Sequence, residues 1–143
     1  FLQLNDQAAE VGLDLLVFPQ GTRSKRLSRG HIGISQIALH QRRPIVPVGC
    51  SGSDQVYPGS SPWAKSGRIT YRFGAPITRE KLAEYAVPGG FTPFDPSDER
   101  THKDRLQKLS SHIMDRINPL VDEPYRFSED LESEGVQGTN RFV

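Results

Sequence analysis

The chain has 143 residues, and its 18 Lys and Arg residues nearly balance its 17 Asp and Glu residues, which gives a formal net charge of +1. A hydrophobic content of 35% and a charged content of 24% are typical of a globular protein and exclude a fibrous or disordered one. The single cysteine, Cys50, excludes an internal disulfide and every zinc-finger spacing. No apolar run reaches the length of about 20 residues that a membrane-spanning helix needs.

In the first half of the chain, helical and strand patterns alternate. Residues 2–11 predict a short helix closed by a glycine, and the continuous apolar run 14–18 predicts a strand buried on both faces. Apolar residues at helical spacing predict a helix over 32–41. A second buried strand is predicted over 45–48, short or bulged because Pro47 has no N–H to donate.

The second half begins with a loop-rich stretch, followed by a half-exposed strand over 68–73, where apolar and polar residues alternate. Thr78 predicts the N-cap of a helix through residue 86. A long helix is predicted from about 97 to 118, with one apolar face formed by Leu106, Leu109, Ile113 and Ile117. This order of elements predicts an α/β fold, with a mixed, largely parallel sheet flanked by helices.

The charges are distributed unevenly along the chain. Residues 15–53 contain six Lys and Arg residues and no Asp or Glu, so this region is expected to attract an anion. Residues 122–134 contain six acidic residues and one arginine. We therefore predict a folded part over 1–121 and an acidic, weakly ordered tail over 122–143.

The segment after the first predicted strand has the composition of a phosphate site. A strand that ends in a glycine-containing turn and leads into a helix exposes backbone N–H groups where the helix dipole favours negative charge. Arg23 could add a guanidinium group that matches the oxygens of a phosphate. The alternative is a solvated basic loop, since charge runs often indicate only exposure.

Three stretches resemble the glycerolipid acyltransferases, the enzymes similar to 1-acylglycerol-3-phosphate acyltransferase. "VFPQGTRS" at 17–24 is similar to their FPEGTRS block, "PIVPVG" at 44–49 resembles their next block, and "GRITYRFGAPI" at 67–77 resembles the segment that follows. The resemblance implies an acyltransferase of the α/β type that acts in phospholipid biosynthesis. Its reaction would transfer a fatty acyl group from acyl-CoA or acyl carrier protein to a hydroxyl of a glycerol phosphate or 1-acylglycerol 3-phosphate.

The resemblance also implies site residues. Gln20, Gly21, Thr22 and Arg23 would bind the acceptor, with Arg23 on its phosphate, and Val46 and Pro47 would shape the substrate pocket. A buried strand with one proline is the plainer interpretation of Val46 and Pro47. Gln20 stands where the family has Glu, so it keeps one acceptor and gains donors but cannot form an ion pair with a neighbouring arginine.

The catalytic His-x-x-x-x-Asp block of that family is missing. The residues five positions after the four histidines are Gln36, Ile45, Gln107 and Ile117, and none is Asp. We therefore expect no catalytic residue here, and no acyltransferase activity of the chain alone. Residues 1–121 would be the C-terminal part of an acyltransferase domain; a degenerate relative is the alternative.

The resemblance implies no metal and no cofactor other than the acyl donor. The expected partners are a lysophospholipid or glycerol phosphate acceptor, the acyl donor, and a membrane surface reached by peripheral contact from the cytoplasm. A non-catalytic module that binds phosphate or nucleic acid is the alternative function. We do not expect nucleic acid, because such modules usually add exposed aromatic residues for stacking, and residues 15–53 contain only Phe18, which the predicted strand would bury.

Overall fold

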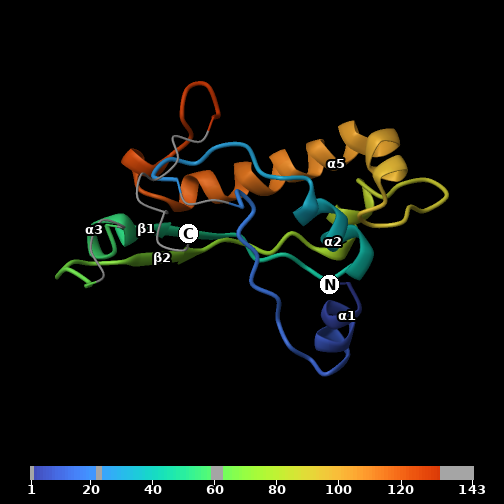
Figure 1. The fold of residues 1–143 in the computed structure, drawn as a ribbon, viewed down its shortest axis with the longest axis horizontal. Coiled ribbons are helices and arrows are strands. Elements are labelled where there is room, and N and C mark those ends of the chain that lie inside the picture. The colour runs from blue at the N-terminus through green and yellow to red at the C-terminus, as the bar shows by residue number, and fades with distance from the viewer. Residues whose placement is uncertain (1, 22–23, 59–62, 133–143) are drawn as a thin grey trace.

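The computed structural model describes residues 2–21, 24–58 and 63–132 (Figure 1). Helices outnumber strands among these residues, and two single-turn 3-10 helices follow the longest helix. In chain order the elements are α1 (Leu2–Glu10), α2 (Gly33–Gln41), β1 (Val48–Ser51), α3 (Ser53–Val56), β2 (Thr70–Phe73), α4 (Arg79–Ala83), α5 (Pro96–Ile117), η1 (Asn118–Leu120) and η2 (Glu123–Tyr125).

The four predicted helices are confirmed by α1, α2, α4 and α5. Side-chain caps explain where two of them begin. The Asp95 carboxylate accepts hydrogen bonds from the backbone N–H groups of Ser97 and Asp98 at 2.9 and 3.0 Å, at the start of α5. Thr78 caps α4 as predicted, and its hydroxyl oxygen accepts from the N–H of Lys81 at 3.4 Å.

The hydrophobic core lies where α5 packs against α2 and α4. The predicted apolar face of α5 is confirmed, since its four residues are all buried, and Met114 joins them. Ala38 and Leu39 of α2 and Leu82 of α4 complete the contact. A buried hydrogen bond of 2.8 Å from the Ser35 hydroxyl to the Leu106 carbonyl also ties α2 to α5.

The sheet that the described residues form has two antiparallel strands, with Val48 opposite Phe73 and Cys50 opposite Tyr71. β2 confirms the strand predicted over 68–73. The strand predicted over 45–48 lies three residues later, as β1, because Pro47 cannot donate to a ladder and contributes only its carbonyl, which accepts from Gly74 N–H at 2.9 Å. A two-stranded sheet does not test whether the sheet is mixed and largely parallel, so that fold class stays a prediction.

The strand predicted over 14–18 was wrong. These residues have no regular secondary structure, and Leu16 and Phe18 are 76% and 75% exposed. A buried strand needs a hydrogen-bonded neighbour, and no described segment pairs with this one. The apolar side chains of the run face a cavity instead.

Residues 125–131, at the start of the predicted tail, are hydrogen-bonded to residues 27–29. Leu27 donates its N–H to the Tyr125 carbonyl and accepts from the N–H of Ser128, both at 3.0 Å. Tyr125 and Ser128 are buried. Backbone groups of this acidic stretch therefore pair with residues 27–29. Residues 133–143 lie outside the described part.

Candidate functional site

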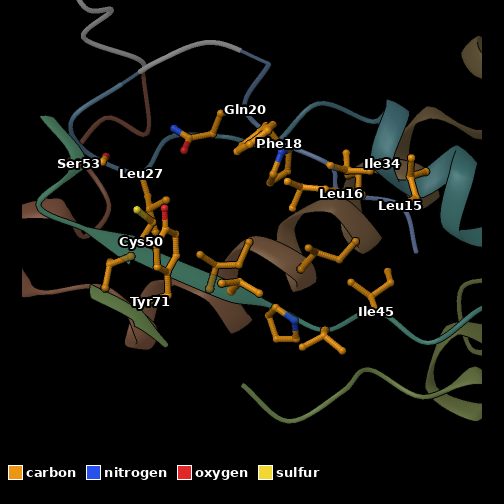
Figure 2. A pocket seen from close by; sticks show the side chains of 18 of the residues that line it. Leu15, Leu16, Phe18, Gln20, Leu27, Ile34, Ile45, Cys50, Ser53 and Tyr71 are labelled. Atoms are coloured by element: carbon orange, nitrogen blue, oxygen red, sulfur yellow. The ribbon is translucent and has the colours of Figure 1, made fainter. Parts of the chain in front are cut away.

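A cavity of about 760 Å³ lies between the 14–20 segment, α2, β1 and the end of α5 (Figure 2). This volume is within the range of small-molecule binding sites. Most of its wall is aliphatic or aromatic. The main apolar contributors, including two residues just before β1, are Leu15, Leu16, Phe18, Ile34, Ile45, Val46, Ile113 and Ile117.

The two ends of this cavity differ in polarity. Figure 2 shows Leu15, Leu16, Ile34 and Ile45 grouped at one end, while Gln20, Ser53, Cys50 and Tyr71 lie toward the other, with Leu27 among them. A site with one apolar end and one more polar end fits an amphiphilic molecule.

Four charged residues also line the cavity. Arg43 and Asp14 lie near each other, with 3.8 Å between Nη2 and Oδ1. Lys25 and Asp54 form no ion pair with any described residue. The cavity therefore offers one cation and one anion that can interact with a ligand.

Gln20 is half-buried and lines the cavity. Its side-chain amide Nε2 donates to the Ser28 hydroxyl oxygen at 2.9 Å and to the Arg26 carbonyl at 3.3 Å. A glutamate could not donate either bond. The glutamine amide therefore ties the turn to Ser28 and to the Arg26 carbonyl, and the second of these bonds needs a side chain that can donate.

Gly21 lies beside the cavity rather than in its wall. Its φ of +66° is a left-handed conformation that favours glycine, and a Cβ built there would lie 2.9 Å from Cδ2 of His31. The turn is closed by hydrogen bonds from Gly21 N–H to the Phe18 carbonyl and from His31 N–H to the Pro19 carbonyl, at 3.0 and 2.8 Å. Glycine at position 21 therefore leaves room for the His31 ring to lie close to the backbone.

Val46 and Pro47 both line the cavity. Val46 is about half exposed at 49%, whereas Pro47 is fully buried. The structure thus brings Gln20, Val46 and Pro47 together around one cavity, although they come from two segments. Thr22 and Arg23 lie outside the described residues, so their predicted contacts with a phosphate stay predictions.

Two of the cations in the basic region are bound to backbone carbonyls. The Arg26 guanidinium donates to the carbonyls of Phe127 and Arg126 at 2.8 and 3.2 Å. Arg43 donates to the carbonyl of Leu13 at 2.8 Å. These two arginines hold the segments on either side of the cavity, so charge counting overstated what is available to a ligand.

Sequence reasoning missed a hydrogen-bonded group at the polar end of the cavity. The Tyr125 hydroxyl donates to Asp54 Oδ1 at 2.7 Å and accepts from the Gln55 amide at 3.2 Å. Burial raises the pKa of Tyr125, and the neighbouring Asp54 carboxylate raises it further. The sequence did contain a signal for this contact, because the acidic stretch includes aromatic residues at 125 and 127 that favour packing against the rest of the chain.

The described residues contain no group of three His, Cys, Asp or Glu side chains that could hold a metal ion. Over the same residues, no helix combines the length and the apolar character needed to cross a membrane.

The chain is 36% identical over 77 residues to a 1-acyl-sn-glycerol-3-phosphate acyltransferase of Cocos nucifera. It is a partial relative of an acyltransferase. The similarity covers 52% of this chain and 25% of the coconut protein, so the chain spans about a quarter of the length of this acyltransferase. No protein-family profile matches the chain, and no solved structure matches it.

Proposed function

We propose that the chain is part of an acyltransferase of phospholipid biosynthesis. The enzyme would transfer a fatty acyl group from acyl-CoA or acyl carrier protein to a hydroxyl of a lysophospholipid or glycerol phosphate, such as 1-acylglycerol 3-phosphate. It would act at the cytoplasmic face of a membrane by peripheral contact. The partial similarity to the coconut acyltransferase supports the reaction class.

One observation carries the proposal. Gln20, in the Pro-Gln-Gly turn, and Val46 with Pro47 line the same cavity, whose polar and apolar ends suit an amphiphilic acceptor. These residues belong to two of the three stretches that resemble the acyltransferases, 17–24 and 44–49. A lysophospholipid would place its acyl chain along Leu15, Leu16, Ile34 and Ile45, and its polar part near Gln20.

The residues of this chain would bind and orient the acceptor rather than perform the chemistry. Acyl transfer to a hydroxyl needs a general base, and the His-x-x-x-x-Asp pair that supplies it in these enzymes is missing from the sequence. The cavity removes an acyl chain from water, and the turn at 19–21 with the basic residues after it would hold the phosphate. Residues 1–143 alone are accordingly expected to bind the acceptor without acylating it.

The test is the binding of lysophosphatidate by residues 1–143, with Arg23→Ala compared with Arg100→Ala. Arg100 is exposed on α5 and is not one of the residues that line the cavity. Hydrogen bonds between charged groups are worth about 1.5 to 3 kcal/mol each, so loss of the Arg23 contact should weaken binding about tenfold to a hundredfold.

Isothermal titration calorimetry gives the dissociation constants directly. The proposal predicts that Arg23→Ala weakens lysophosphatidate binding while Arg100→Ala binds like the unmodified chain. No binding by the unmodified chain, or equal effects of the two substitutions, would contradict it.

A further inference from the structure

The polar end of the cavity has an arrangement of groups that a phosphate alone does not explain. Three tyrosines, Tyr57, Tyr71 and Tyr125, line the cavity together with Asp54. A phosphate is repelled by a carboxylate, and the electron-rich faces of tyrosine rings also disfavour an anion. The same groups attract a positively charged ligand.

Backbone pairing brings these side chains together from distant parts of the sequence. Asp54 and Tyr57 belong to α3 and the residue after it, directly beyond β1. Tyr71 stands opposite Cys50 in the sheet, and Figure 2 shows its side chain beside Cys50 at the polar end. The Cys50 thiol and its hydrogen bond are the main causes that raise the pKa of Tyr71, and Tyr57 lines the same cavity.

The carboxylate of Asp54 has capacity left for a ligand. Oδ1 accepts the Tyr125 hydroxyl at 2.7 Å, which fixes the orientation of the group. The described residues give Asp54 no ion pair and no hydrogen bond other than the one from Tyr125. An oriented carboxylate among tyrosines is a known means of recognising an organic ammonium group.

Lys25 supplies the opposite charge in the same cavity. It is exposed and forms no ion pair with the described residues. Because Asp54 and Lys25 are both without an ionic partner there, the cavity matches a ligand that carries one positive and one negative charge. A phosphate linked to an ammonium group has this pair of charges.

We propose that the polar end of the cavity binds the zwitterionic headgroup of a lysophospholipid, with Asp54 and the tyrosines facing the ammonium group and Lys25 facing the phosphate. The inference rests on the proposed function and narrows the acceptor to a lysophospholipid whose phosphate carries choline or ethanolamine. The acyl chain of that ligand extends toward Leu16 and Ile45.

The experiment compares lauroyl lysophosphatidylcholine with lauroyl lysophosphatidate, which lacks the ammonium group. Both are titrated calorimetrically, below their micelle concentrations, into residues 1–143 and into Asp54→Asn. Asparagine keeps an oxygen that can accept the Tyr125 hydroxyl, so the variant removes the charge and retains the hydrogen bond. Asp14→Asn is the matched control, since Asp14 lines the same cavity and lies near Arg43.

Asp54→Asn should weaken binding of the choline lipid about tenfold and leave binding of lysophosphatidate unchanged or stronger. Asp14→Asn should leave the ratio of the two dissociation constants unchanged. Tyr71→Leu should also weaken choline binding several-fold, and Tyr71→Phe, which keeps the ring, should restore it. If Asp54→Asn affects both lipids equally or neither, the headgroup site is wrong and the proposed function stands. If neither lipid binds the unmodified chain, both proposals fail.

Discussion

The hydroxyl of Tyr125 donates a 2.7 Å hydrogen bond to the Asp54 carboxylate, across 71 residues of sequence. It joins the stretch after α5 to α3 and closes one end of the cavity. Since Tyr125 is buried and its backbone carbonyl also accepts from Leu27 N–H, the acidic stretch contributes to the structure of the site.

Stability at high pH should depend on Tyr125. Its pKa is raised in the folded chain by burial and by Asp54, so the folded state holds the phenolic proton more tightly than the unfolded state. The resulting stabilisation is fully present below the pKa of an unfolded tyrosine, near 10, and is lost as the pH rises through the higher folded value.

Urea denaturation at a series of pH values up to the alkaline range measures this loss. Tyr125→Phe should reduce the decline in the free energy of unfolding above a pH of about 10. Part of the decline should remain in this variant, because the pKa of Tyr71 is also raised. An identical decline in Tyr125→Phe would show that Tyr125 does not contribute.

Arg26→Ala should loosen the 125–131 stretch. The substitution removes two hydrogen bonds from a charged donor, to the carbonyls of Arg126 and Phe127, and the partial exposure of the pair limits the cost to about 1 to 2 kcal/mol. Hydrogen exchange of the Leu27 and Ser128 amides should accelerate. Lys25→Ala, the neighbouring cation, is the control and should leave this exchange unchanged.

Gln20→Glu should destabilise the turn even though Glu is the residue found in the resembling enzymes. A carboxylate cannot donate to the Arg26 carbonyl, and it places negative charge against that oxygen, whereas the Ser28 hydroxyl can rotate to donate to it. We expect a loss of about 1 kcal/mol in urea denaturation. Gln3→Glu, on the exposed surface of α1, controls for the added charge; equal losses would argue against the hydrogen bonds.

Two glycines with similar backbone angles should respond differently to alanine. Gly52 and Gly12 have φ of +84° and +79°, so both substitutions impose the strain of a left-handed residue, about 1 to 2 kcal/mol. A Cβ at Gly52 would also collide with the Arg68 carbonyl oxygen, whereas nothing lies within 4 Å of one at Gly12. The melting temperature should fall much further for Gly52→Ala than for Gly12→Ala. Equal decreases would mean that the backbone at residue 68 moves away from the added Cβ at little cost.

The elements set by local signals were predictable from the sequence. The Thr78 cap located the start of α4 and the apolar stripe located α5, because both signals act within a few residues. The run at 14–18 has the composition of a strand, but a strand needs a partner that composition does not reveal. Pro47 correctly indicated an irregular strand, while the position of β1 followed from its pairing with β2.

The candidate site was predictable only in part, for the same reason. Gln20, Val46 and Pro47 were expected from short stretches of sequence, and they line the cavity. Asp54 and Tyr125 were missed because their contact depends on the path of the chain after α5. The sequence also did not reveal that Arg26 donates to backbone carbonyls. A cation with such a structural role therefore could not be distinguished from one that binds a ligand.

The central claim is that the cavity holds the acyl chain of a lysophospholipid. A lysophospholipid with a nitroxide at the end of its acyl chain, added to residues 1–143, tests it through paramagnetic broadening of isoleucine and valine methyl signals in NMR spectra. We expect strong broadening at Ile34 and Ile45, which line the apolar end, and weaker broadening at Val87, which is buried and does not line the cavity. Bound lipid that leaves Ile34 and Ile45 sharp, or broadens all methyl signals alike, would contradict it.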